Sequence, residues 1–167
     1  MTQSFIWTVS NPEPTAVNDN AATEEDTPVT GNALSNDDDP DGDALSVTGF
    51  TIAGGGRHAP GDSVVIAGVG TFTLDGDGEY SFTPAQDWNG TVPTVPYSIS
   101  DGEGGSDTAT LIITVTPVND APVTNGTIAD QSDEDAETIA DLDITGFFSD
   151  IDSPALSYSA SGLPEGL

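Results

Sequence analysis

The sequence predicts an all-β fold, an antiparallel Greek-key β-sandwich, on three observations. Short apolar segments alternate with polar residues at the period of a half-buried strand. Gly, Pro, Asn and Asp separate these segments at regular intervals, and no segment has helical periodicity. About seven such strands in about 100 residues are typical of a sandwich.

The expected strands occupy residues 27–29, 45–48, 71–74, 79–82, 95–100 and 106–116. Residues 75–78, Asp-Gly-Asp-Gly, join two of them as a hairpin, because Asp-Gly supplies the positive φ of tight turns. The apolar positions that share one face form the predicted core: Val29, Leu45, Val47, Phe72, Leu74, Tyr80, Phe82, Tyr97, Ile99, Leu111, Ile113 and Val115.

The charge balance is strongly acidic and excludes two classes of partner. The chain has 29 acidic residues against a single basic one, Arg57, and a formal net charge of −28. That field repels nucleic acid and anionic membranes. A disordered acidic tail is the alternative, but the apolar residues are patterned, so we expect a folded domain whose acidic repulsion is relieved by cations.

Two other composition features narrow the class further. The chain has no Cys, so its stability comes from core packing or from bound ions and not from disulfides. No apolar run approaches the roughly 20 residues of a membrane-spanning helix, and no signal peptide is present, so direct membrane insertion is not expected.

A repeated signature divides the chain. Residues 14–19 and 117–123 each contain Val-Asn-Asp after a proline, and the two copies lie about 100 residues apart, as in a tandem array. We therefore predict the last strand of a preceding domain plus a linker at 1–13, a complete sandwich at 14–120, and a partial second β-module at 121–167. The expected strands of the flanking parts are residues 4–9, 139–144 and 156–159.

The acidic segment at residues 37–43 predicts a metal site of one particular kind. Asp37, Asp39 and Asp41 followed by Gly42 fit the first half of an EF-hand loop, but the twelfth position is Thr48 where a bidentate Glu is required, so the EF-hand interpretation fails. Hard oxygen donors without Cys suit Ca²⁺ and not zinc. An acidic loop can also be merely solvated, and that alternative stays open.

The chain resembles known families. Residues 25–29, 36–43, 70–74, 100–105 and 115–123 are similar to the cadherin-like tandem repeats of large bacterial surface adhesins, also called VCBS or bacterial Ig-like repeats. The tail, at 141–152 and 161–167, is similar to the opening half of a dystroglycan-type cadherin-like domain, and residues 5–9 resemble the last strand of that domain type.

The resemblance implies Ca²⁺ sites at the two junctions. Cadherin-type modules take their ligands from a strand-A Glu, an Asp-x-Glu, an Asn-Asp linker and an Asp-x-Asp of the next domain. At the second junction these positions are Glu25 (or Glu24), Asp101, Glu103, Asn119, Asp120, Asp150 and Asp152. At the first junction the available positions are Asn18, Asp19, Asp39 and Asp41.

The resemblance favours a Ca²⁺-rigidified spacer of a secreted surface adhesin, with the neighbouring repeats of the same polypeptide as its partners and a role in cell adhesion or biofilm formation. The alternative is a module that binds carbohydrate or protein through the Gly-rich loop at residues 54–62 or through Trp88, including an accessory module of a hydrolase. For Trp88, packing against the core is favoured over stacking on a sugar, because large aromatic side chains usually anchor packing.

No enzyme is expected. A lone His58 in a Gly-rich loop does not make a catalytic triad, and with 29 acids some carboxylate pair is inevitable. Head-to-tail association between molecules is a further expectation, because unpaired strand edges recruit other chains.

Overall fold

The computed structural model describes residues 3–4, 6, 10–129, 142–153 and 155–161. The chain divides into two compact units, Met1–Val118 and Asn119–Leu167, each of which is described by itself. Among the described residues, no helix has the length and hydropathy needed to cross a membrane.

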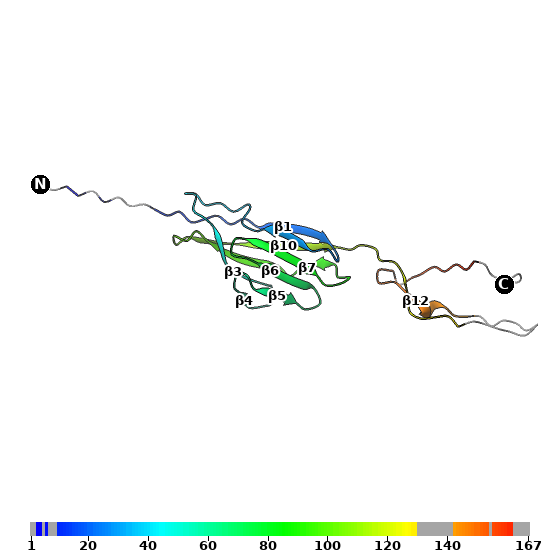
Figure 1. Cartoon of the computed structure of the whole chain (residues 1–167). Helices are drawn as coiled ribbons and strands as arrows, with labels where there is room; N and C mark the ends of the chain where they lie inside the picture. The colour runs from blue at the N-terminus through cyan, green and yellow to red at the C-terminus, as the bar shows by residue number, and fades with distance from the viewer. Residues whose placement is uncertain (1–2, 5, 7–9, 130–141, 154, 162–167) are drawn as a thin grey trace, which may run out of the picture. The chain divides into compact units, whose positions relative to one another are not determined.

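The first unit is a sandwich of two sheets (Figure 1). One sheet has the order β1 (Asp19–Glu24), β10 (Ser106–Thr116), β9 (Val95–Ser100), β3 (Ser46–Thr51) and β4 (Arg57–His58), with β8 (Gly90–Thr91) also on β10. The other has the order β2 (Val29–Asn32), β7 (Glu79–Pro84), β6 (Gly70–Leu74) and β5 (Ser63–Ile66). The predicted all-β sandwich is confirmed.

One strand pair departs from the antiparallel prediction. Strand β1 runs parallel to β10, from Asp19 opposite Leu111 to Glu24 opposite Thr116. The sequence of β1, Asp-Asn-Ala-Ala-Thr-Glu, has no large apolar residue, so alternation did not predict a strand there. Backbone pairing along the free side of the long strand β10 forms it instead.

The core lies between the two sheets and contains most of the predicted residues. Val29, Leu45 and Tyr80 are only partly buried and pack against it. The buried apolar residues that were not predicted are Ala33, Phe50, Ile52, Val92, Val95 and Ala109. Phe50 follows a β-bulge between Val47 and Gly49. The bulge shifts the alternation of buried and exposed residues along the strand, so the sequence pattern did not place Phe50 in the core.

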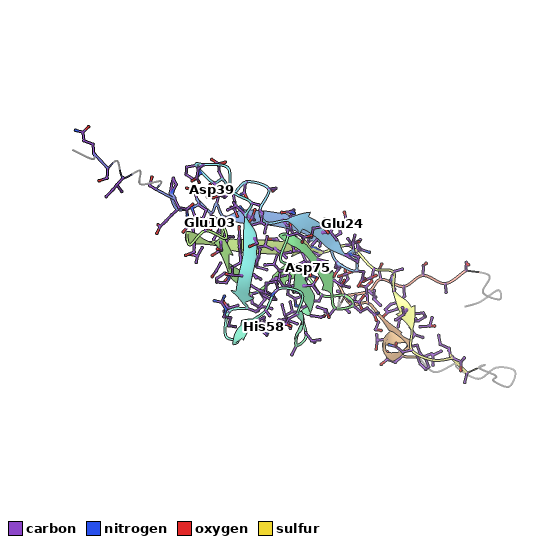
Figure 2. All side chains as sticks on the ribbon, turned by 60° about the vertical axis from the view of Figure 1, so that its left-hand side comes forward. Glu24, Asp39, His58, Asp75 and Glu103 are labelled. Carbon is purple, nitrogen blue, oxygen red and sulfur yellow. The ribbon has the colours of Figure 1, made fainter. Side chains whose placement is uncertain are left out.

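The strand registers define two ends of the sandwich. We call the end that carries the β9–β10 turn, residues 101–105, the hairpin end, and the end where β10 stops at Thr116 the exit end. The eleven residues of β10 separate the two ends by about 34 Å at the usual rise of a strand. Figure 2 shows Asp39 and Glu103 at one end and Glu24 at the other.

The second unit has little regular structure in its described residues. Strand β11 (Val123–Thr124) pairs antiparallel with β12 (Phe148–Ser149), which follows a 3₁₀ helix, η1 (Thr145–Phe147). The predicted strand at residues 156–159 is wrong: this segment is irregular, and Tyr158 packs on Phe148 with ring centroids 5.5 Å apart.

Two further predicted strands cannot be compared with the structure. Most of residues 4–9 and the first three residues of 139–144 lie outside the described residues, whereas residues 142–144 form no strand.

Candidate metal centre

The loop at residues 39–43 folds around the carboxylate of Asp39. One oxygen of Asp39, Oδ1, accepts hydrogen bonds from the backbone N–H groups of Asp41, Gly42 and Asp43, each at 3.1 Å. Gly42 has φ +86°, a conformation that glycine adopts without steric cost. The loop therefore buries Asp39 to 8% exposure while Asp41 stays exposed.

The second oxygen of Asp39 has no partner. Among the described residues, Oδ2 of Asp39 is the buried side-chain atom that lacks any hydrogen bond. One carboxylate oxygen of each of Asp39, Asp41 and Asp43 lies within 4.8 Å of the other two. A buried carboxylate oxygen without a donor is costly, so the arrangement calls for a cation or a proton.

The carboxyl groups of Asp39 and Asp41 interact, which lowers the pKa of Asp39 and raises the pKa of Asp41. A divalent ion bound between them neutralises both carboxylates at once. Three carboxylates in a flexible loop suit Ca²⁺, which takes six to eight oxygen ligands.

Asp101 starts a similar turn at the same end but is fully engaged. Its Oδ1 accepts the N–H groups of Glu103, Gly104 and Gly105 at 2.8, 3.0 and 2.9 Å. Its Oδ2 accepts Asn11 Nδ2 at 2.7 Å and the N–H of Gly105 at 3.0 Å. Burial raises the pKa of Asp101, but the hydrogen bonds from Asn11 and the backbone outweigh it and leave that pKa lowered.

The structure does not bring Asp101 and Glu103 together with Glu25. Asp101 and Glu103 belong to the hairpin end, whereas Glu25 follows Glu24, which pairs with Thr116 at the exit end. The physical reason is the antiparallel β9–β10 hairpin, which places its turn at the far end from the point where β10 stops. The eleven-residue strand after residue 105 was the sequence signal for this separation.

Glu25 is buried at the exit end. Its side chain is 5% exposed, and its Oε1 accepts the backbone N–H of Val118. Its Oε2 accepts Asn89 Nδ2 at 3.1 Å, and its own N–H donates to Thr116 O at 2.9 Å. Glu25 thus holds residues 116–118, where the chain leaves the sandwich, by hydrogen bonds. The sequence analysis did not predict its partner Asn89.

The remaining predicted ligands of the second junction lie in the second unit. Asn119 Nδ2 donates to Asp120 O, and the N–H of Asp120 donates to Asp152 Oδ2, both at 2.6 Å. Asp150 Oδ1 accepts the N–H groups of Asp152 at 2.9 Å and Ser153 at 2.7 Å. The unit thus orders its own Asp-x-Asp turn, and the joint ligand set with Glu25 stays a prediction.

The first Asn-Asp pair has a role inside the sandwich. Asn18 Oδ1 accepts the N–H of Thr110 at 2.9 Å, and Asp19 Oδ2 accepts the hydroxyl of Tyr97 at 2.8 Å. Tyr97 is 1% exposed and also contacts Ala33 O at 3.0 Å. Asn18 and Asp19 therefore attach β1 to β9 and β10, and Asp19 is not among the carboxylates gathered around Asp39.

Two more aspartates hold the same segment: Asp37, which the sequence placed in the acidic loop, and Asp107, which it did not single out. Asp37 Oδ1 accepts the N–H of Val17 at 2.7 Å, and Asp107 Oδ2 accepts the N–H of Ala16 at 2.8 Å. Burial raises the pKa values of Asp37 and Asp19, whereas the backbone donor of Ala16 lowers that of Asp107. The roles of these two aspartates are seen only in the folded structure, because the residues they contact lie 20 and 91 positions away in the sequence.

The features named for sugar binding are used for packing. Within the Gly-rich loop, Arg57 Nη2 donates to Thr48 O at 3.0 Å, and the His58 ring lies 5.3 Å from that of Phe50. Trp88 contacts Phe82 edge-on at 6.5 Å and packs against the core, which confirms its structural interpretation.

Comparison with known proteins identifies the sandwich. No curated protein matches the chain. A solved nucleoside hydrolase-related hypothetical protein from Saccharophagus degradans, described as associated with carbohydrate metabolism, matches at 15% identity over 64% of this chain and 26% of its own, with a TM-score of 0.44.

The family model of the bacterial cadherin-like domain matches residues 11–117, the span of the described sandwich. Such domains are adhesion or extender modules of surface or extracellular proteins and generally bind Ca²⁺. The chain belongs to the bacterial cadherin-like domain family.

Proposed function

We propose that this protein is a Ca²⁺-rigidified extender module of a long bacterial surface adhesin, supporting cell adhesion or biofilm formation from the cell exterior. The observation that carries the proposal is the buried, unpartnered Oδ2 of Asp39 beside Asp41 and Asp43. A buried carboxylate oxygen that lacks a hydrogen-bond donor and lies beside other carboxylates is stabilised by a bound cation.

The position of this loop suits a stiffening role. The chain enters the sandwich beside it, where Thr15 and Asp38 exchange backbone hydrogen bonds of 2.8 and 3.1 Å. Asn11 is attached to Asp101 at the same end. A cation held by Asp39 would therefore restrain the entering segment, since it fixes the residue next to Asp38.

The charge of the molecule supports the same role. At a net charge of −28, neighbouring acids repel one another unless a cation screens them. Modules of this kind in extracellular proteins bind Ca²⁺ at about 10⁻⁴ to 10⁻³ M, which matches the calcium content of an exterior medium. We expect a joint that is loose without calcium and stiff with it.

Small-angle X-ray scattering of the full chain during a Ca²⁺ titration tests this proposal. The expected result is a narrower distribution of conformations and a higher melting temperature in calcium than in EDTA. Asp39→Asn should reduce the scattering change and leave the sandwich folded, because it replaces the unpartnered carboxylate oxygen with an amide group. Identical scattering and melting in calcium and EDTA would refute the proposed function.

A further inference from the structure

The outer face of the second sheet carries a polar groove that the extender role does not use. Phe72, Leu74 and Phe82 point into the core, so the alternate residues of β6 and β7 point outward. The groove has a volume of about 500 Å³. It is lined by Thr30, Gly31, Asn32, Thr73, Asp75, Glu79, Tyr80 and Ser81.

Hydroxyl groups form the floor of this groove. Ser81 of β7 lies opposite Thr30 of β2 on one side and Thr73 of β6 on the other. Thr73 Oγ1 and Ser81 Oγ are 2.8 Å apart and hydrogen-bonded. Three hydroxyls thus lie side by side on paired strands, where the hydrogen-bonded sheet holds their spacing.

Carboxylates and an amide line the groove toward the β6–β7 turn. Asn32 is fixed, because its Nδ2 donates to Asp77 O at 3.0 Å and its Oδ1 accepts the N–H of Leu34 at 2.8 Å. Asp75 and Glu79 are exposed and use none of their side-chain oxygens in hydrogen bonds to other described residues. Those oxygens are available as acceptors for a ligand.

This combination defines the chemistry of the ligand. Hydroxyls both donate and accept, and free carboxylates accept, so the matching ligand carries many hydroxyl groups of its own. No basic residue lines the groove, and the charge of −28 repels anions. The volume is within the range of small-ligand sites, about 300–1,000 Å³.

We propose that this groove binds a short stretch of a neutral polysaccharide. The inference goes beyond the extender role, because it gives the module a ligand of its own on a face distinct from the two ends. Binding through hydroxyls and carboxylates of one sheet requires no metal ion.

Affinity electrophoresis of the full chain tests the proposal. The protein is run through native gels that contain hydroxyethyl cellulose, dextran or galactomannan, with alginate as an anionic polysaccharide. We expect retardation by at least one neutral polymer, none by alginate, and the same retardation in EDTA. The variant Thr73→Val/Ser81→Ala should weaken binding on the order of tenfold, because it removes two hydrogen-bonding hydroxyls.

The matched control is Thr71→Val/Thr83→Ala. Thr71 and Thr83 form the cross-strand pair two positions away, on the same face of the same two strands, but do not line the groove. This double variant should bind like the unsubstituted protein. The proposal is overturned if no neutral polymer retards the chain, if both double variants lose binding equally, or if EDTA abolishes retardation while circular dichroism shows an intact sandwich.

Discussion

Two aspartates at the hairpin end, Asp39 and Asp101, begin turns with the same hydrogen bonds to Oδ1 but differ in the hydrogen bonds to Oδ2. In both, Oδ1 accepts the backbone N–H groups of the second, third and fourth residues that follow. Asp39 and Asp101 are similarly buried, at 8% and 5% exposure. The difference is at Oδ2, which accepts two hydrogen bonds in Asp101 and none in Asp39.

The residues that follow each aspartate explain the difference. A Cβ on Gly105 would lie 2.2 Å from Asp101 Oδ2, so only glycine lets the backbone close over that oxygen. The Asp39 turn instead ends in Asp43, and carboxylate oxygens of Asp41 and Asp43 lie within 4.8 Å of the Asp39 carboxylate. We call the Asp101 turn closed, because both of its carboxylate oxygens accept hydrogen bonds, and such a turn stabilises the fold. We call the Asp39 turn open, because its Oδ2 accepts none and is able to bind a cation.

The largest effect is expected from Asp101→Ala. The substitution leaves the N–H groups of three hairpin residues and the amide of Asn11 without their acceptor, and unpaired buried donors are costly. We expect the melting temperature of the sandwich to fall by about 10 °C. Differential scanning calorimetry measures it, and a fall of less than about 2 °C would show that the closed turn is dispensable.

Acidic pH should remove calcium binding at the open turn. The pKa of Asp41 is raised, so the folded, calcium-free domain holds a proton on the Asp41 carboxyl group more tightly than the unfolded chain does. The stability that this proton contributes is lost as pH rises through the raised pKa. Ca²⁺ must displace the proton. Below the raised pKa we expect affinity to fall by up to about tenfold per pH unit.

Calorimetric titration with Ca²⁺ at pH 7 and at pH 4.5 measures this dependence. Asp41→Asn serves as the control, because it removes the titrating group and should flatten the pH profile. Equal affinity of the unsubstituted protein at the two pH values would show that protonation of Asp41 does not compete with the cation.

A smaller effect is expected from Asp19→Asn. Burial raises the pKa of Asp19, and its charge faces that of Asp37, whereas an amide keeps an acceptor for the Tyr97 hydroxyl. At pH 7 we expect the melting temperature to rise by about 3 °C. Because the raised pKa favours the protonated folded form at low pH, the gain should shrink as pH falls. A loss of stability at pH 7 would contradict this account.

The sequence predicted those parts of the fold that depend on local alternation. Strands β9 and β10 and the core positions Phe72, Leu74 and Phe82 were predictable because buried and exposed residues alternate along them. Strand β1 was not, since its pairing with β10 depends on a partner about 90 positions away and not on its own apolar residues.

The candidate site was predictable in part for the same reason. Asp39 and Asp41 are recognisable because the whole loop lies in one short segment. The closed state of Asp101 depends on Asn11, and the burial of Glu25 depends on Asn89, so neither follows from local sequence. Sequence motifs identify residues that are able to bind a cation, and the fold decides which of them have an oxygen left for it.

The most direct test compares the calcium response of two amide variants, Asp39→Asn and Asp101→Asn. Both keep an oxygen for the backbone donors, and each removes one carboxylate. The measured quantity is the rise in melting temperature between EDTA and 5 mM Ca²⁺, a concentration of about five times the weaker expected dissociation constant.

We expect Asp39→Asn to lose most of this rise while its melting temperature in EDTA is unchanged or higher, since the amide can donate to Asp41. Asp101→Asn should melt lower in both conditions and keep the rise. A full calcium response in Asp39→Asn would contradict the assignment of the open turn as the cation site.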